Sequence, residues 1–234
     1  LDVDSGKTLT LTGASAATTG ALTKVDAGTL VLTGANLHTG ATTISGGTLQ
    51  LGDGGTSGSL SGTSIVNNAT LVFDRSNTLQ IGQIISGSNG NAQVIQAGSG
   101  TTELTKANSY RGFYMVNAGH LKVGPTGMLY GGGWFAKNNA VTVNTGGTLQ
   151  LTSWGWGSSG STGMLGHEAA HMLVNGGTIE YVGAADELRN GYGFTIGTNG
   201  ATLRNDTAFD WNAGSGTSIA NPSTLTLRGT GTGD

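Results

Sequence analysis

The sequence predicts an all-β fold, a solenoid of about ten stacked coils. A short phrase recurs along the chain, in which a small residue is followed by Thr-Leu, a variable residue and an apolar residue. Its two apolar residues stand two positions apart, which puts both on one face of a strand. Glycine accounts for 44 of the 234 residues, and charged residues for only 10%. Glycine and threonine are poor helix formers, so the composition favours short strands joined by turns.

The recurring phrase sets the period of the predicted solenoid. Between the first apolar residues of successive copies, the intervals are 21, 19 and 22 residues from Leu9 to Leu71. From Leu121 to Leu225 they are 28, 30, 24 and 22 residues. A period of about 20 residues with inserts is typical of solenoids, whose coils stack because one coil cannot bury its apolar face alone. The residues expected to point into the core are Leu30, Leu32, Leu49, Leu51, Leu71, Leu149, Leu151, Ile179, Leu203 and Leu225.

The charge balance disfavours several classes of partner. The chain has 10 Lys and Arg against 13 Asp and Glu, a formal net charge of −3, with no basic stripe. Because binding to nucleic acid depends on neutralising phosphates, we expect no nucleic-acid partner. No apolar run approaches the roughly 18 residues of a membrane-spanning helix, so we expect no membrane-spanning segment.

One stretch of the sequence is similar to a known family. The run from Gly28 to Gly52, GTLVLTGANLHTGATTISGGTLQLG, resembles the autotransporter-associated β-strand repeat of passenger proteins, and Thr101 to Gly124 is a degenerate copy. The resemblance implies a right-handed parallel β-helix, secreted or exposed on the outer-membrane surface of a Gram-negative-type bacterium. It also implies a scaffold without catalytic residues, and we expect no cofactor. We expect residues 1–234 to form one β-helix domain, a fragment of a larger secreted protein.

Aromatic residues cluster in the two long steps of the repeat. Tyr130 and Trp134 follow one copy of the phrase, and Trp154 and Trp156 follow the next, each among glycines. Rings flanked by glycine are unshielded by their neighbours and offer flat faces to sugar rings. Alternatively, the same rings cap the solenoid and cover apolar core. We expect these four residues to bind carbohydrate, because exposed aromatic surface usually marks a contact.

A second candidate site is the segment His167-Glu168-Ala169-Ala170-His171. It matches the HExxH pattern, in which two histidines on one face of a helix bind zinc and the glutamate acts as a base. Glycines on both sides make a helix unfavourable here, and the residues that follow lead into a repeat strand. The segment is therefore more typical of a coil before a strand, and His167 and His171 remain weak candidates for metal ligands.

Carboxylates provide a third set of candidates. A glycosidase requires two carboxyl groups held about 5 to 10 Å apart. Adjacent coils stack about 4.8 Å apart, so Glu180 and a residue one rung away would meet this requirement. The sequence does not assign the register between coils, and no pair is selected. The weak catalytic candidates are Glu168, Glu180, Asp186 and Glu187.

Three hypotheses about function follow from these patterns. The leading one is an extracellular scaffold or adhesin-type passenger segment whose aromatic loops contact polysaccharide or a cell-surface glycan. The alternative is a polysaccharide-degrading β-helix enzyme, a glycoside hydrolase or lyase, which would need a clustered carboxylate pair. The third is a zinc hydrolase that uses the His-Glu-Ala-Ala-His segment.

Overall fold

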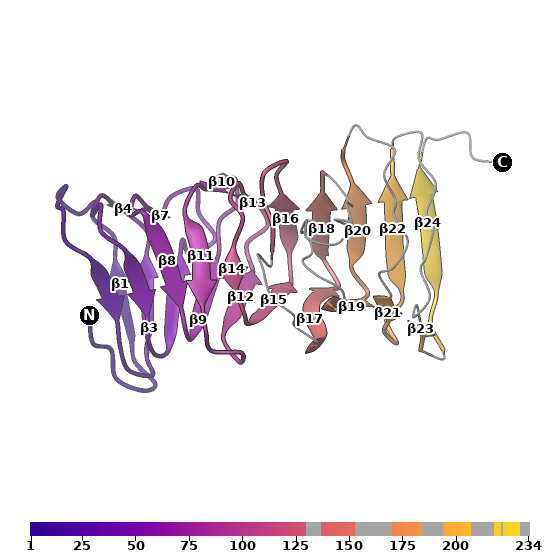
Figure 1. Ribbon diagram of the computed structural model, residues 1–234, viewed down its shortest axis with the longest axis horizontal. Coiled ribbons are helices and arrows are strands. Elements are labelled where there is room, and N and C mark those ends of the chain that lie inside the picture. The colour runs from indigo at the N-terminus through magenta and orange to yellow at the C-terminus, as the bar shows by residue number, and fades with distance from the viewer. Residues whose placement is uncertain (130–136, 153–169, 184–193, 207–217, 221, 230–234) are drawn as a thin grey trace.

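The chain folds as an elongated parallel β-solenoid (Figure 1). The computed structural model describes residues 1–129, 137–152, 170–183, 194–206, 218–220 and 222–229. These residues form strands and turns without any helix, so none of them belongs to a helix that could cross a membrane. The predicted all-β solenoid is thus confirmed, while its handedness and its number of coils stay predictions.

Strands from successive coils build two long sheets, and every strand pair in them is parallel. The ten-stranded sheet contains, in spatial order, β1 (Thr8–Leu11), β3 (Thr29–Leu32), β6 (Thr48–Leu51), β9 (Thr70–Phe73), β12 (Gln93–Gln96), β15 (Phe113–Val116), β17 (Lys137–Asn144), β19 (Ala170–Asn175), β21 (Phe194–Ile196) and β23 (Ser218–Ile219). The seven-stranded sheet contains β10 (Thr78–Ile81), β13 (Thr101–Leu104), β16 (Gly119–Val123), β18 (Gly147–Leu151), β20 (Thr178–Tyr181), β22 (Ala201–Asn205) and β24 (Leu225–Gly229).

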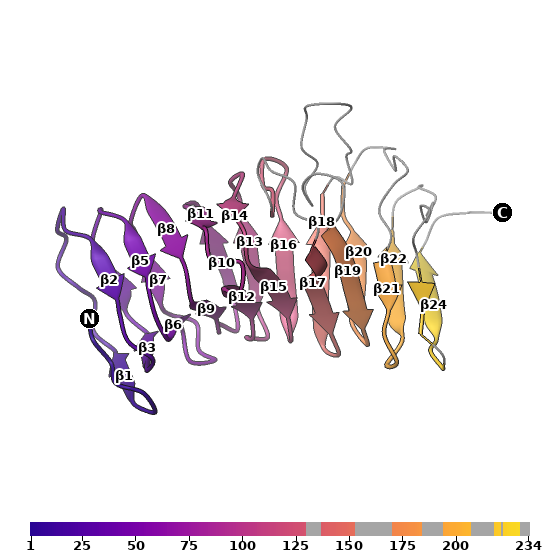
Figure 2. The same cartoon turned by 60° about the horizontal axis from the view of Figure 1, so that its bottom comes forward.

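Two smaller sheets complete the N-terminal half of the solenoid. A five-stranded sheet runs from β2 (Leu22–Lys24) through β5 (Thr42–Ile44), β8 (Ser64–Asn67) and β11 (Ile84–Gly87) to β14 (Ser109–Tyr110), as Figure 2 shows. A two-stranded sheet joins β4 (Ala35–Asn36) to β7 (Ser59–Leu60). In the described residues the five-stranded sheet ends at β14, and later coils consist of the two long sheets alone.

The core consists of apolar residues stacked in register from coil to coil. Leu30 lies opposite Leu49, and Leu49 opposite Leu71, because each occupies the same place in its phrase. Of the ten residues expected to point inward, nine are at most 3% exposed. Leu225 is the exception at 37%, because it lies in the terminal strand of its sheet, where no described strand stacks on its outer side.

The copies of the phrase do not form a single ladder. Those that begin at Thr8, Thr29, Thr48 and Thr70 lie in the ten-stranded sheet, whereas the copies from Gly119 onward lie in the seven-stranded sheet. The second sheet starts at β10, which has the sequence TLQI and follows soon after β9. The same phrase serves both sheets because each needs apolar residues at alternate positions and nothing more specific.

The small residue at the start of the phrase has a steric cause. Gly47 has a φ of +62°, in the left-handed region that favours glycine. A Cβ atom added there would lie 2.2 Å from the carbonyl oxygen of Gly28 in the preceding coil. Gly119, which starts a copy of the phrase in the seven-stranded sheet, has the same conformation, and a Cβ atom there would lie 2.3 Å from the Gly100 oxygen. Glycine at the start of the phrase therefore lets the coils approach closely enough at both positions to form the parallel sheets.

Two tyrosines fill the interior where the five-stranded sheet ends. Tyr110 and Tyr114 are fully buried, with their ring centroids 5.4 Å apart in an edge-to-face arrangement. The Tyr110 hydroxyl accepts a hydrogen bond from Asn67 Nδ2 at 3.2 Å, and burial raises the pKa of Tyr110. The Tyr114 hydroxyl donates to the carbonyl oxygen of Leu129 at 3.1 Å. Each buried hydroxyl thus has a partner, as burial of a polar group requires.

The stacked core makes a prediction about stability. Leu149 is fully buried, with Leu121 and Ile179 on either side in register. We expect Leu149→Ala to reduce the free energy of unfolding by roughly 2–5 kcal/mol, the cost of lost burial plus a cavity. Leu227 continues the same row but is 64% exposed, so Leu227→Ala is the matched control. Equal losses in chemical denaturation would contradict the stacking argument.

Candidate functional site

Most of the site residues expected from the sequence lie outside the described part of the chain. Only Glu180 and the backbone of His171 are described. The others therefore stay predictions, and they are Tyr130, Trp134, Trp154, Trp156, His167, Glu168, Asp186 and Glu187.

The strands on either side show where these segments are anchored. Each of the intervals 130–136, 153–169, 184–193 and 207–217 follows a strand of the seven-stranded sheet and precedes a strand of the ten-stranded sheet. The preceding strands β16, β18, β20 and β22 are consecutive neighbours, and so are the following strands β17, β19, β21 and β23. The four intervals contain all four tryptophans of the chain. In the preceding coils, β11 and β14 of the five-stranded sheet occupy this same connection.

The end of the His-Glu-Ala-Ala-His segment lies in a strand. Ala170 and His171 are the first two residues of β19, so the backbone is extended there. The HExxH zinc pattern uses a helix to place its two histidines on one face. No helix runs through to His171, which fits the interpretation of this segment as the approach to a repeat strand.

Glu180 forms part of a hydrogen-bonded row on the outer face of the seven-stranded sheet. Gln150 Nε2 donates to Glu180 Oε2 at 2.6 Å, and Arg204 Nη1 lies 3.2 Å from Glu180 Oε1. Gln150 and Arg204 are the residues in register one rung away on either side. A carboxylate pair in register with Glu180 is therefore not formed. Glu180 is 7% exposed and has both oxygens engaged, which suits a structural role.

A second group of the same composition precedes it in the row. Gln80 Nε2 donates to Glu103 Oε2 at 3.1 Å, and Lys122 Nζ lies 3.0 Å from Glu103 Oε1. The hydrogen bond from Lys122 holds the pKa of Glu103 below its ordinary value, although burial acts in the opposite direction. Each group consists of a glutamine, a glutamate and a cation in successive coils. In a parallel sheet, residues in register lie on the same face of neighbouring strands. The side chain of one coil can therefore form a hydrogen bond or an ion pair with that of the next coil.

The group of Gln150, Glu180 and Arg204 ends in a further ion pair. Arg204 Nη2 lies 2.6 Å from Asp206 Oδ2, and the hydrogen bond to this carboxylate raises the pKa of Arg204. Neither group could be found from the sequence alone, because both occupy the variable position of the phrase. They become visible only when copies are aligned by rung.

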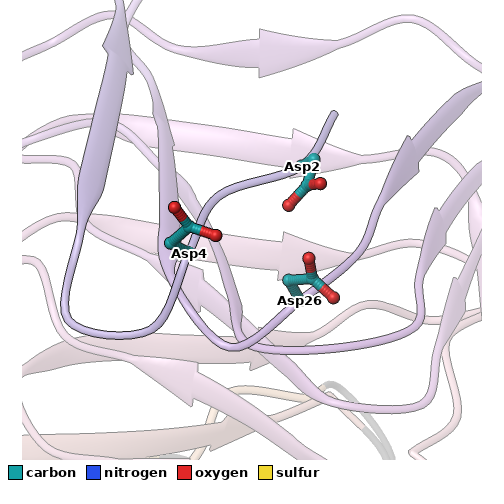
Figure 3. A group of neighbouring side chains, drawn as sticks. All are labelled: Asp2, Asp4 and Asp26. Atoms are coloured by element: carbon teal, nitrogen blue, oxygen red, sulfur yellow. The ribbon is translucent and has the colours of Figure 1, made fainter.

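Three carboxylates gather at the N-terminal end of the solenoid. The side chains of Asp2, Asp4 and Asp26 point toward one another, and their oxygens lie within 4.8 Å (Figure 3). Lys24 is buried close by, but its ammonium donates to the backbone oxygens of Val25, Asp26 and Gly46. A hydrogen bond to Asp26 and repulsion from its charge raise the pKa of Asp2. Oxygen ligands of this kind suit calcium, but three exposed carboxylates are not by themselves a metal site.

The fold defines the chain as a parallel β-solenoid built from repeated coils. Comparisons with known proteins agree with this fold. The passenger-associated-transport-repeat family matches residues 22–51 and 94–123. The chain therefore carries two copies of the repeat of autotransporter passengers, and the resemblance of the sequence to that family is confirmed.

A relative of known identity supports the same assignment. The chain is 52% identical over 66 residues to the adhesin BmaC autotransporter of Brucella suis biovar 1 (strain 1330). The matched segment covers 28% of this chain and 2% of the relative's length. No solved structure is significantly similar to the chain. The chain thus carries passenger-associated-transport repeats and is similar, over part of its length, to a small part of an adhesin autotransporter.

The acidic cluster predicts a pH effect on stability. Because folding raises the pKa of Asp2, its protonated form favours the folded state, and that stability is lost as the pH rises through the raised pKa. Asp26→Asn removes the repelling charge, and asparagine tolerates the φ of +59° found at this position. We expect the variant to have a higher unfolding midpoint than the wild type at about pH 7, and a smaller difference at about pH 3.

The matched control for this prediction is Asp53→Asn, which removes an exposed carboxylate outside the cluster. Thermal unfolding followed by circular dichroism over this pH range measures the effect. A midpoint for Asp26→Asn that is no higher than that of the wild type near neutral pH would contradict the predicted repulsion.

The contacts of Glu180 lead to a prediction about the free energy of unfolding. In Glu180→Gln, an amide group replaces one of the two acceptor oxygens, so either Gln150 or Arg204 loses its partner. We expect a loss of about 1–2 kcal/mol in the free energy of unfolding. The control is Asp206→Asn, which alters an exposed partner of the same arginine and is expected to cost much less. If Glu180→Gln unfolds like the wild type, the carboxylate does not hold the coils together.

Proposed function

We propose that this chain is an adhesin-type segment of an autotransporter passenger, located outside a Gram-negative-type bacterium, which contacts polysaccharide through aromatic loops. The observation that carries the proposal is the common anchoring of the four intervals 130–136, 153–169, 184–193 and 207–217, three of which contain the four tryptophans of the chain. They leave four neighbouring strands of one sheet and return to four neighbouring strands of the other. Two comparisons support the proposal. The repeats match the passenger-associated-transport-repeat family, and the relative that is 52% identical over 66 residues is an adhesin.

The solenoid gives such loops a regular spacing. Neighbouring strands in a sheet lie about 4.8 Å apart, so successive anchors are held at that interval on a rigid support. A polymer whose rings repeat at a regular interval can contact a series of side chains only if their spacing stays constant, and a rigid support keeps it constant. Tryptophan is suited to this contact because it has a large flat face, few rotatable bonds and a polar N–H group.

A binding role is favoured over an enzymatic one by the surroundings of Glu180. Hydrolysis of a glycosidic bond requires an acid and a second carboxylate at a fixed separation. Of the catalytic candidates, Glu180 is the one in the described residues, and glutamine and arginine occupy both of its oxygens. We therefore place the polysaccharide contact in the loops, and regard the scaffold as their support.

The proposal predicts that tryptophan is needed for binding but not for folding. We expect Trp154→Ala and Trp156→Ala each to weaken retention on cellulose, xylan or pectin by roughly 1–2 kcal/mol of binding free energy, the scale of a truncated aromatic contact. Substitution by phenylalanine is the matched control, since it keeps a ring and should keep part of the binding. Pull-down and thermal unfolding are measured on the same samples.

Two results would contradict this prediction. If the wild type is retained on no polysaccharide, the proposed contact does not exist. If the alanine variants unfold at markedly lower temperature and bind as the wild type does, the rings cover the core of the solenoid.

A further inference from the structure

The outer face of the seven-stranded sheet carries two straight polar rows. One row consists of the glutamine, glutamate and cation groups described above, followed by Arg228 in the last strand. The other row lies two residues earlier in each strand. Its members, in register, are Thr78, Thr101, His120, Thr148, Thr178, Thr202 and Thr226. Apart from Glu180, every side chain in the two rows is at least partly exposed.

The threonine hydroxyls of this row form no hydrogen bond with any described residue. This holds for all six threonine side chains of the row. They form a line of free donors and acceptors repeated at about 4.8 Å. Over seven strands this line extends about 29 Å along the solenoid axis.

The charged row, together with Asp206, leaves the face without a net charge. Glu103 and Glu180 are each bonded to a cation in the next coil, and Arg204 is also bonded to Asp206. With Arg228, three cations stand against three carboxylates. Neither row contains an aliphatic or aromatic hydrocarbon side chain. The backbone donors and acceptors of the inner strands are already paired within the sheet.

These properties select one class of partner. A lipid surface requires apolar side chains, an acidic polymer requires excess positive charge, and an added protein strand requires a free sheet edge. This face provides none of these along its rows. A neutral polymer rich in hydroxyl groups requires only hydrogen-bonding groups in line, which the rows supply. Single hydroxyl contacts are weak, so affinity must come from many contacts along one chain.

We propose that the threonine row is a binding track for an extended neutral polysaccharide that lies along the solenoid axis. The track begins at β10, two coils before β16, the strand that precedes the first of the four intervals, and it continues through β18, β20 and β22 to β24. The inference rests on the proposed function in taking the partner to be a polysaccharide, but it uses a different surface. The polymer would contact hydroxyl groups on the sheet in addition to rings in the loops.

The test removes hydroxyl groups while keeping the shape of the side chain. In Thr148→Val/Thr178→Val, valine keeps the branched side chain that suits a strand. The matched control is Thr29→Val/Thr48→Val, two neighbouring threonines on the outer face of the ten-stranded sheet, where Val31 lies in the adjoining row. Binding is measured by affinity electrophoresis in gels that contain neutral glucan, xylan or mannan. Carboxymethyl cellulose serves as the acidic polymer, and thermal unfolding is recorded in parallel.

We expect the wild type to bind a neutral polymer, and the Thr148/Thr178 variant to bind it roughly tenfold more weakly, the effect of two lost hydrogen bonds. The control variant should bind like the wild type, and all three should unfold at similar temperatures. Oligosaccharides of increasing length should compete better as they span more rungs. Unchanged binding in the Thr148/Thr178 variant, or binding to the acidic polymer alone, would overturn the track.

The outcomes separate this inference from the proposed function. If the tryptophan variants lose binding and the threonine variant does not, the loops bind and the track does not exist. The reverse pattern overturns the loop contact and supports the track. If the wild type binds no polysaccharide, both are overturned.

Discussion

Parallel stacking in register is the constraint on which this molecule depends. Each inner strand forms its backbone hydrogen bonds with the coil before and the coil after, so a coil has little structure of its own. The exposure of one row of residues makes this visible. Ile179 is fully buried and Leu203 is 3% exposed, whereas Leu227, next in register and on the terminal strand, is 64% exposed. Burial is therefore decided by the neighbouring coil, since the local sequence is nearly the same.

The strands and the core were predictable because a period of two is a strong local signal. The residues expected to point inward were buried wherever a coil stacked on both sides, as at Leu49 and Leu149. The change from one sheet to the other was not predictable. A phrase such as Thr48–Leu51 differs little from Gly147–Leu151, yet the two lie in different sheets. Which sheet a phrase joins depends on the turns between phrases, and the spacing of apolar residues carries no information about these turns.

The candidate site residues also fall into those that the sequence could predict and those that it could not. Aromatic residues in long inserts could be selected from composition and spacing alone. The row that holds Glu180 could not, because it depends on which residue lies one rung away, and a register shifted by one position would reverse every side chain. Lys24 shows a further limit. Its ammonium is buried against three backbone oxygens of a corner, where a sequence pattern indicates only a solvated charge.

The position of the inserts follows from the end of the five-stranded sheet. In the two coils that contain β11 and β14, the connection from the seven-stranded to the ten-stranded sheet includes a strand that is hydrogen-bonded to a neighbouring coil, which constrains its length. Tyr110 and Tyr114 close the interior at that point with their own hydrogen bonds satisfied. Beyond it, the described residues contain no further strand of the five-stranded sheet, and the two ends of each connection lie in strands of the long sheets. Because the entropy of closing a loop grows only slowly with its length, inserts at this corner cost the core little. All four tryptophans can therefore lie where the sequence varies in length, while the outer rows of the seven-stranded sheet keep the spacing of the coils.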